Sequence, residues 1–244
     1  MTTLLSVNGV KKRFGGFTAL GGIDLEIHAG ERVGLIGPNG SGKSTLVNCL
    51  SGTLRHDSGS VHLAGRRLDG LPAHARTRLG LARSFQLPRP FASLTVAENI
   101  RIPLLYTVNA RPGEKLAASA LAARCNELLD LVGLAPIAGK MPADLTQIEM
   151  RKLELARALA SEPTLLIADE AMAGLSHGEV DEILFLLLRL NQQGITIILI
   201  EHIMRAVMQF SDRLVVLVAG HKIADGLPAS VVKMPEVERA YLGE

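Results

Sequence analysis

Gly37-Pro38-Asn39-Gly40-Ser41-Gly42-Lys43-Ser44-Thr45 is the most informative segment of this sequence. It follows an apolar run, residues 32–36, that suits a buried strand, and a helix is expected from about Lys43. A strand before and a helix after are the context that the phosphate-loop (Walker A) pattern G-x-x-x-x-G-K-[ST] requires. Its glycines let backbone N–H groups converge on phosphate oxygens without Cβ clashes, and the helix N-terminus adds partial positive charge.

This motif predicts a binding site for the phosphates of a nucleotide. We expect Lys43 to reach the β- and γ-phosphates and Ser44 to bind Mg²⁺. The alternative is a glycine-rich turn with an exposed lysine, which the flanking strand and helix disfavour.

A second apolar run, Leu165-Leu166-Ile167-Ala168-Asp169-Glu170, ends in two acids. Carboxylates at the carboxyl end of a strand face the crevice in which ligands bind to open parallel sheets. We expect Asp169 to join the Mg²⁺ shell and Glu170 to orient and deprotonate an attacking water. Two solvated acids at a strand end would be the alternative if the phosphate loop were absent.

The remaining pattern predicts an α/β fold. Residues 23–27 alternate like a half-buried strand, and the short apolar runs 195–200 and 214–218 each follow a segment of helical spacing, 179–190 and 203–210. Such alternation indicates a parallel sheet with helices on its faces.

The middle of the chain differs, because it contains no convincing strand and has helical spacing at 115–132 and 149–160. We therefore expect a single domain, 1–244, whose core comprises about 1–90 and 160–244 and whose inserted helical subdomain comprises about 91–159.

The composition disfavours a membrane-spanning chain. Hydrophobic residues make up 48% and charged residues 20% of the 244, and the mean hydropathy is +0.26. The longest stretches without Asp, Glu, Lys or Arg are 11 residues, 44–54 and 190–200, whereas a spanning helix needs about 20 mostly apolar residues. The N-terminus also lacks the pattern of a signal peptide. We expect the chain to stay in the cytoplasm.

Charge and aromatic content disfavour nucleic acid as a partner. The net charge is +2, and the chain has six Phe, two Tyr and no Trp for base stacking. Cys49 and Cys125 show no zinc or redox spacing, so we expect two buried thiols.

Together these motifs resemble the ATP-binding subunits of ABC transporters, over essentially the whole chain. The resemblance implies ATP and Mg²⁺ as ligands. It also implies a P-loop NTPase core with a mixed or parallel sheet, an N-terminal antiparallel β subdomain and an inserted helical subdomain.

Three further residues match family positions in order. Phe14 lies where the family has an aromatic that stacks on adenine. Gln86 matches the glutamine that touches Mg²⁺ and the attacking water, and His202 matches the histidine that contacts the γ-phosphate. Taken alone, the three would be an edge or core aromatic, a polar surface residue and a structural histidine.

One segment departs from the family pattern. Where the family has Leu-Ser-Gly-Gly-Gln before an Ala-Arg-Ala-Leu helix, this chain has Leu145-Thr146-Gln147-Ile148-Glu149. In the family this signature grips the γ-phosphate of the ATP held by a second subunit. Side chains in place of both glycines should obstruct that approach, and Glu149 should add negative charge there.

The departure predicts an asymmetric heterodimer rather than a homodimer. The ATP site that contains Lys43, Asp169 and Glu170 would be completed by the partner's intact signature. The second ATP site, which is completed by residues 145–149 of this chain, would be weakened. The segment 173–176 matches the short loop that couples the two sites.

Residues 81–86, 91–100 and Ala240-Tyr241-Leu242-Gly243 resemble the branched-chain amino acid importers of this family. The resemblance implies membrane permease subunits, indirectly a solute-binding protein, and a peripheral location on the cytoplasmic face of the inner or plasma membrane. Urea, amide and aromatic-acid importers use similar ATPases. Three other functional classes are the alternatives: a non-transport ABC protein, a non-catalytic ATP-binding regulator and an unrelated small-molecule kinase.

Overall fold

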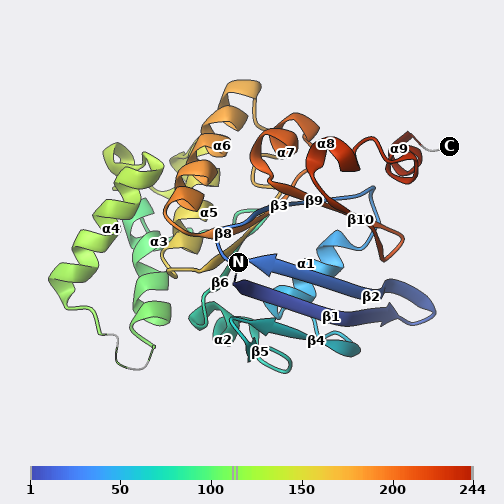
Figure 1. The fold of residues 1–244 in the computed structure, drawn as a ribbon. Coiled ribbons are helices and arrows are strands. Elements are labelled where there is room, and N and C mark those ends of the chain that lie inside the picture. The colour runs from blue at the N-terminus through green and yellow to red at the C-terminus, as the bar shows by residue number, and fades with distance from the viewer. Residues whose placement is uncertain (1, 112, 114, 243–244) are drawn as a thin grey trace.

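Within the residues that the computed structural model describes, 2–111, 113 and 115–242, a six-stranded sheet has the order β10-β9-β3-β8-β7-β6 (Figure 1). Gly243 of the C-terminal motif lies outside the described residues. Five strands are parallel, and β10 pairs antiparallel with β9 at one edge. The strands are β3 (Arg32–Ile36), β6 (Leu81–Ser84), β7 (Leu165–Asp169), β8 (Thr196–Ile200), β9 (Arg213–Val218) and β10 (His221–Gly226).

A second, antiparallel sheet has the order β2-β1-β4-β5. It confirms the expected N-terminal β subdomain, and it contains the predicted strand at 23–27. Its strands are β1 (Thr3–Phe14), β2 (Phe17–His28), β4 (Ser58–Leu63) and β5 (Arg66–Arg67). The mixed sheet and this second sheet together confirm the predicted α/β class.

Helices cover both faces of the six-stranded sheet, and the predicted helices begin and end within a few residues of the expected bounds. The helix expected at 115–132 begins later, at Ala118, and those expected at 149–160, 179–190 and 203–210 are α5, α6 and α7. The helices are α1 (Lys43–Ser51), α2 (Ala73–Arg78), α3 (Val96–Pro103), α4 (Ala118–Val132), α5 (Gln147–Leu159), α6 (His177–Gln192), α7 (Met204–Phe210), α8 (Pro228–Val231) and α9 (Pro235–Leu242), with a π-helix at Leu104–Val108 and 3₁₀ turns at Ala135–Ile137 and Pro142–Asp144.

The two faces of the sheet belong to separate apolar clusters. Leu166 and Ala168 join the cluster beneath the helices of the middle segment and α6, whereas Leu165 and Ile167 join the cluster shared with α1 and the antiparallel sheet. Successive side chains of a strand point to opposite faces, so β7 is buried on both sides. This explains why β7 is a continuous apolar run.

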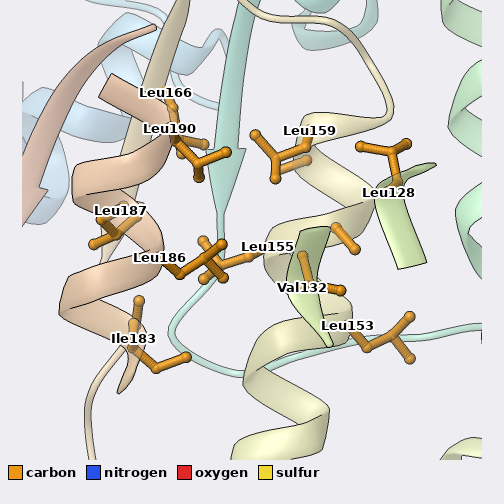
Figure 2. Close-up of a cluster of buried hydrophobic side chains, with 14 of the residues drawn as sticks. Leu128, Val132, Leu153, Leu155, Leu159, Leu166, Ile183, Leu186, Leu187 and Leu190 are labelled. Atoms are coloured by element: carbon orange, nitrogen blue, oxygen red, sulfur yellow. The ribbon is translucent and has the colours of Figure 1, made fainter. Parts of the chain in front are cut away.

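Helix α5 packs between α4 and α6. In Figure 2, Leu155 of α5 faces Leu186 of α6, and Val132 of α4 lies beside Leu153 of α5. The helices of the middle segment and one face of the sheet therefore contribute to the same apolar cluster. Among the described helices, none combines the length and apolar composition needed to cross a membrane.

Candidate nucleotide site

The predicted phosphate loop joins β3 to α1 and holds a conformation that glycine makes accessible. Gly42, the residue before α1, has φ +105°, and a Cβ there would lie 2.7 Å from the carbonyl oxygen of Ala19. A Cβ on Gly37 would lie 2.1 Å from the carbonyl oxygen of Leu217. Side chains at these two positions are therefore excluded by both space and backbone conformation.

Lys43 is the first residue of α1, and its side chain is buried inside the loop. Its Nζ donates to the carbonyl oxygens of Gly37 at 2.7 Å and Pro38 at 3.1 Å. Burial lowers the pKa of Lys43, while the negative charges of Glu170 and Asp169 oppose that shift. The loop thus encloses one ammonium group at the N-terminus of a helix, an arrangement suited to an anion.

Two hollows at the carboxyl edge of the sheet bring the predicted residues together. Phe14, at the end of β1, lines both and is 50% exposed. A cavity of about 720 Å³ also includes Ser44, Gln86 and Asp169 in its wall. A smaller hollow of about 240 Å³ is lined by Phe14, Phe17, Ala19, Asn39, Gly40, Ser41, Gly42, Lys43, Ser44, Thr45, Glu170 and His202.

Two other predicted catalytic side chains, those of Gln86 and His202, contact the carboxylate of Glu170. Its Oε2 accepts a hydrogen bond from Nε2 of Gln86 at 2.5 Å, and its Oε1 lies 3.3 Å from Nε2 of His202. These residues follow β7, β6 and β8, which are neighbours in the sheet. The backbone of Glu170 is left-handed, with φ +47°, a conformation that costs a non-glycine residue about 1–3 kcal/mol and is typical of functional sites.

Asp169 is held by an arginine to which the sequence assigned no role. Arg83 of β6 donates from Nη2 and Nε to Oδ2 of Asp169, at 2.6 and 3.2 Å. Its Nη1 donates to Oδ1 of Asn48 on α1 at 2.7 Å. The available signal was a cation directly after the apolar pair Leu81-Ala82, since a cation in a buried strand needs a partner.

Glu201 is a second residue that sequence reasoning missed. It directly follows β8, as Glu170 directly follows β7, so the same pattern of an acid at the end of an apolar strand marked it. The side chain is 3% exposed and accepts a hydrogen bond from the backbone N–H of Met172 at 2.8 Å. Burial raises the pKa of Glu201 to about 7, and the charge of Glu170 adds to this, against the N–H groups of Met172 and His202 and the charge of Arg151.

The divergent signature segment forms the start of α5. The Thr146 hydroxyl accepts from the N–H of Glu149 at 3.4 Å, and the Glu149 carboxylate accepts from the N–H of Thr146 at 2.7 Å. This capping box lowers the pKa of Glu149. Nε2 of Gln147 donates to the carbonyl oxygen of Ala173 at 3.3 Å, while Leu145 and Ile148 pack, partly buried, against the core.

The β3–loop–α1 unit and the two acids at the carboxyl end of β7 together define a nucleotide-binding protein of the phosphate-loop class. The model of the ABC transporter family matches residues 20–173. The chain therefore belongs to the ABC transporter family, and it is an ATP-binding cassette.

Known relatives match nearly the full length. The high-affinity branched-chain amino acid transport ATP-binding protein LivG of Escherichia coli (strain K12) is 39% identical over 250 residues, 99% of this chain and 98% of the relative. BraF of Pseudomonas aeruginosa, which has the same description, is 36% identical over 254 residues, again 99% and 98%. The chain is homologous to these transport ATPases.

Solved structures agree with this fold. The ADP conformation of MJ1267, an ATP-binding cassette of an ABC transporter, is similar at a TM-score of 0.89 and 29% identity, and each chain is covered completely. A nucleotide-free ATP-binding cassette from an ABC transporter is similar at a TM-score of 0.86 and 28% identity, also over 100% of both chains. Cassettes of this family bind nucleotide, and they belong to a family of ATPases.

Proposed function

We propose that this chain is the ATP-hydrolysing subunit of an importer for branched-chain or other hydrophobic amino acids. ATP hydrolysis is supported by one observation above all: the side chains of Gln86 and His202 both contact the Glu170 carboxylate. The solute class rests on the full-length similarity to LivG and BraF, which are described as branched-chain amino acid transport proteins. Urea, amides or aromatic acids are the alternative solutes.

The donor set fits ATP with Mg²⁺. The Ser44 hydroxyl and the Asp169 carboxylate supply hard oxygen donors in one cavity, which suits Mg²⁺. Both bonds from Arg83 end on Oδ2 of Asp169, so we assign Oδ1 to the metal shell. When bound, Mg²⁺ neutralises charge on the β- and γ-phosphates.

The chain's own residues divide the remaining work. Phe14, exposed at the end of β1, stacks on adenine, and Lys43 holds the β- and γ-phosphates. Glu170 orients a water and accepts its proton as the water attacks the γ-phosphate. Gln86 keeps the Glu170 carboxylate aimed at that water, and His202 contacts the γ-phosphate.

We further propose that the chain pairs with a second, different ATPase subunit. Gln147 fills the space above the 173–176 loop of its own subunit, where Nε2 lies 2.4 Å from the position of a Cβ on Gly174. The triphosphate held by the partner is therefore hindered from approaching the backbone at this end of α5. The partner's signature completes the site on Lys43 and Glu170.

Permease subunits would dock on exposed apolar side chains beside Gln86. Phe85, Leu87 and Phe91 are exposed on the segment after β6, and Tyr106 is exposed nearby. Phe85, Phe91 and Tyr106 line a groove of about 300 Å³. An apolar patch of this kind is typical of an interaction surface. It would hold the chain on the cytoplasmic face of the inner or plasma membrane, with a solute-binding protein acting through the permease.

Two variants test this proposal. Lys43→Ala should remove nucleotide binding and hydrolysis together, and normal ATP affinity would overturn the assignment of the phosphate loop. Glu170→Gln should abolish turnover of the assembled pair. Unchanged turnover, with activity lost instead when the partner's equivalent acid is changed, would mean that the asymmetry is reversed. ATP binding without turnover in the unaltered pair would favour a non-catalytic, regulatory ABC protein.

A further inference from the structure

Arg151 lies in the second turn of α5 and is 8% exposed, yet its guanidinium bonds outside its own helix. Nη1 donates to the carbonyl oxygen of Gln86, and Nη2 donates to the carbonyl oxygen of Ala173 at 3.0 Å. One side chain therefore joins three segments that are far apart in the sequence.

The two carbonyls belong to the segments that flank Glu170. Nε2 of Gln86 donates a hydrogen bond to Oε2 of Glu170 at 2.5 Å. Ala173 closes the turn after β7, because its N–H donates to the carbonyl oxygen of Glu170 at 3.2 Å. Arg151 thus holds the backbone on both sides of the Glu170 carboxylate.

The planar fork of arginine suits this task. It presents two N–H donors at a fixed spacing, whereas the lysine ammonium is a single compact point. The guanidinium also lies near the carboxyl groups of Glu201, Glu154 and Glu170, which partly oppose the lowering of the Arg151 pKa by burial. The same helix begins with the signature segment, and Gln147 donates to the carbonyl of Ala173 as well.

We propose that Arg151 is a positioning residue for ATP hydrolysis: by binding the carbonyls of Gln86 and Ala173, it keeps the Gln86 amide on Glu170. The inference rests on the proposed role of Glu170 as the base. It also links the start of α5 mechanically to that base, so that a shift of α5 moves Gln86.

Arg76 offers a matched control. It is 3% exposed, and its Nη1 donates to the carbonyl oxygens of Cys49 and Leu50 at 2.7 and 2.8 Å. Burial lowers the pKa of Arg76 as it does for Arg151. Arg76→Met therefore removes a similarly buried guanidinium that binds the carbonyls of Cys49, Leu50 and Leu71, away from Glu170.

The test uses the complete transporter with Arg151→Met, Arg151→Lys, Gln86→Ala and Arg76→Met. Arg151→Met should lower kcat roughly 10- to 100-fold, the scale expected when a reacting group is misplaced by about 1 Å, with ATP affinity within about twofold. Arg151→Lys should recover part of this loss. Arg76→Met should lower the melting temperature while kcat stays within about twofold.

The double variant Arg151→Met with Gln86→Ala separates positioning from general destabilisation. If Arg151 acts through Gln86, the double variant is no slower than the slower single variant, because the two losses are not additive. Additive losses, or a kcat for Arg151→Met equal to that of Arg76→Met, would overturn the inference. The proposed function is judged separately by Glu170→Gln, since retained turnover in that variant contradicts the base itself and not the action of Arg151.

Discussion

Replacing Glu201 with glutamine should make the protein more stable above neutral pH. The carboxyl is almost fully buried, and its pKa is raised from 4.5 to about 7. The folded protein therefore keeps a proton that the unfolded chain loses between these two values. The free energy of unfolding falls as pH rises through this window, by roughly 3 kcal/mol in total, since one pKa unit corresponds to about 1.4 kcal/mol.

Glutamine removes the titration and keeps an oxygen that can accept the N–H of Met172. Urea unfolding at pH 5 and pH 8 measures the effect. We expect Glu201→Gln to exceed the wild type by roughly 2–3 kcal/mol at pH 8 and to lie within about 1 kcal/mol of it at pH 5. Glu179→Gln is the control. Hydrogen bonds from Ser176 lower the pKa of that exposed carboxylate, so this substitution should lower, not raise, the free energy of unfolding at pH 8. If Glu201→Gln keeps the pH dependence of the wild type, the buried carboxylate does not titrate as argued.

Three further outcomes follow from the site and its supports. Thr146→Ala removes the capping box of α5 and should lower the free energy of unfolding by about 1 kcal/mol in urea titrations, whereas Thr146→Ser should not. Burial raises the pKa of the Cys49 thiol to about 11, so iodoacetamide at pH 8 should label it only in denaturant; rapid labelling of the native protein would contradict its burial. Gly37→Ala should abolish ATP binding in a fluorescence titration, because its Cβ would overlap the carbonyl of Leu217, whereas Gly40→Ala, which meets no atom within 4 Å, should have the smaller effect.

Local patterns made the nucleotide-binding half of the site predictable. The phosphate loop is contiguous, and the two acids at the carboxyl end of β7 directly follow an apolar run. Glu149 shows the limit of a family comparison: it was read as a charge near the partner's ATP, whereas its carboxylate also closes a capping box with Thr146. That bond was readable from the Thr-x-x-Glu spacing alone.

The unpredicted parts depend on the order of strands in the sheet. Arg83 meets Asp169 because β6 pairs with β7, and no local pattern in the sequence reports that pairing. Strand β6 itself has only four residues, too few to show a clear strand pattern in the sequence. Arg151 reaches Gln86 and Ala173 only after α5 packs into the core. Residues that organise the site from a distance were therefore missed, although their sequence neighbours were assigned roles.

The role of Glu170 as the base is decided by ATP turnover of the assembled transporter carrying Glu170→Gln, with ATP binding measured in parallel. If Glu170 is the base, kcat falls by at least about 100-fold while ATP affinity is retained. Turnover close to that of the wild type would contradict the assignment of Glu170 and, with it, the roles given to Gln86 and His202.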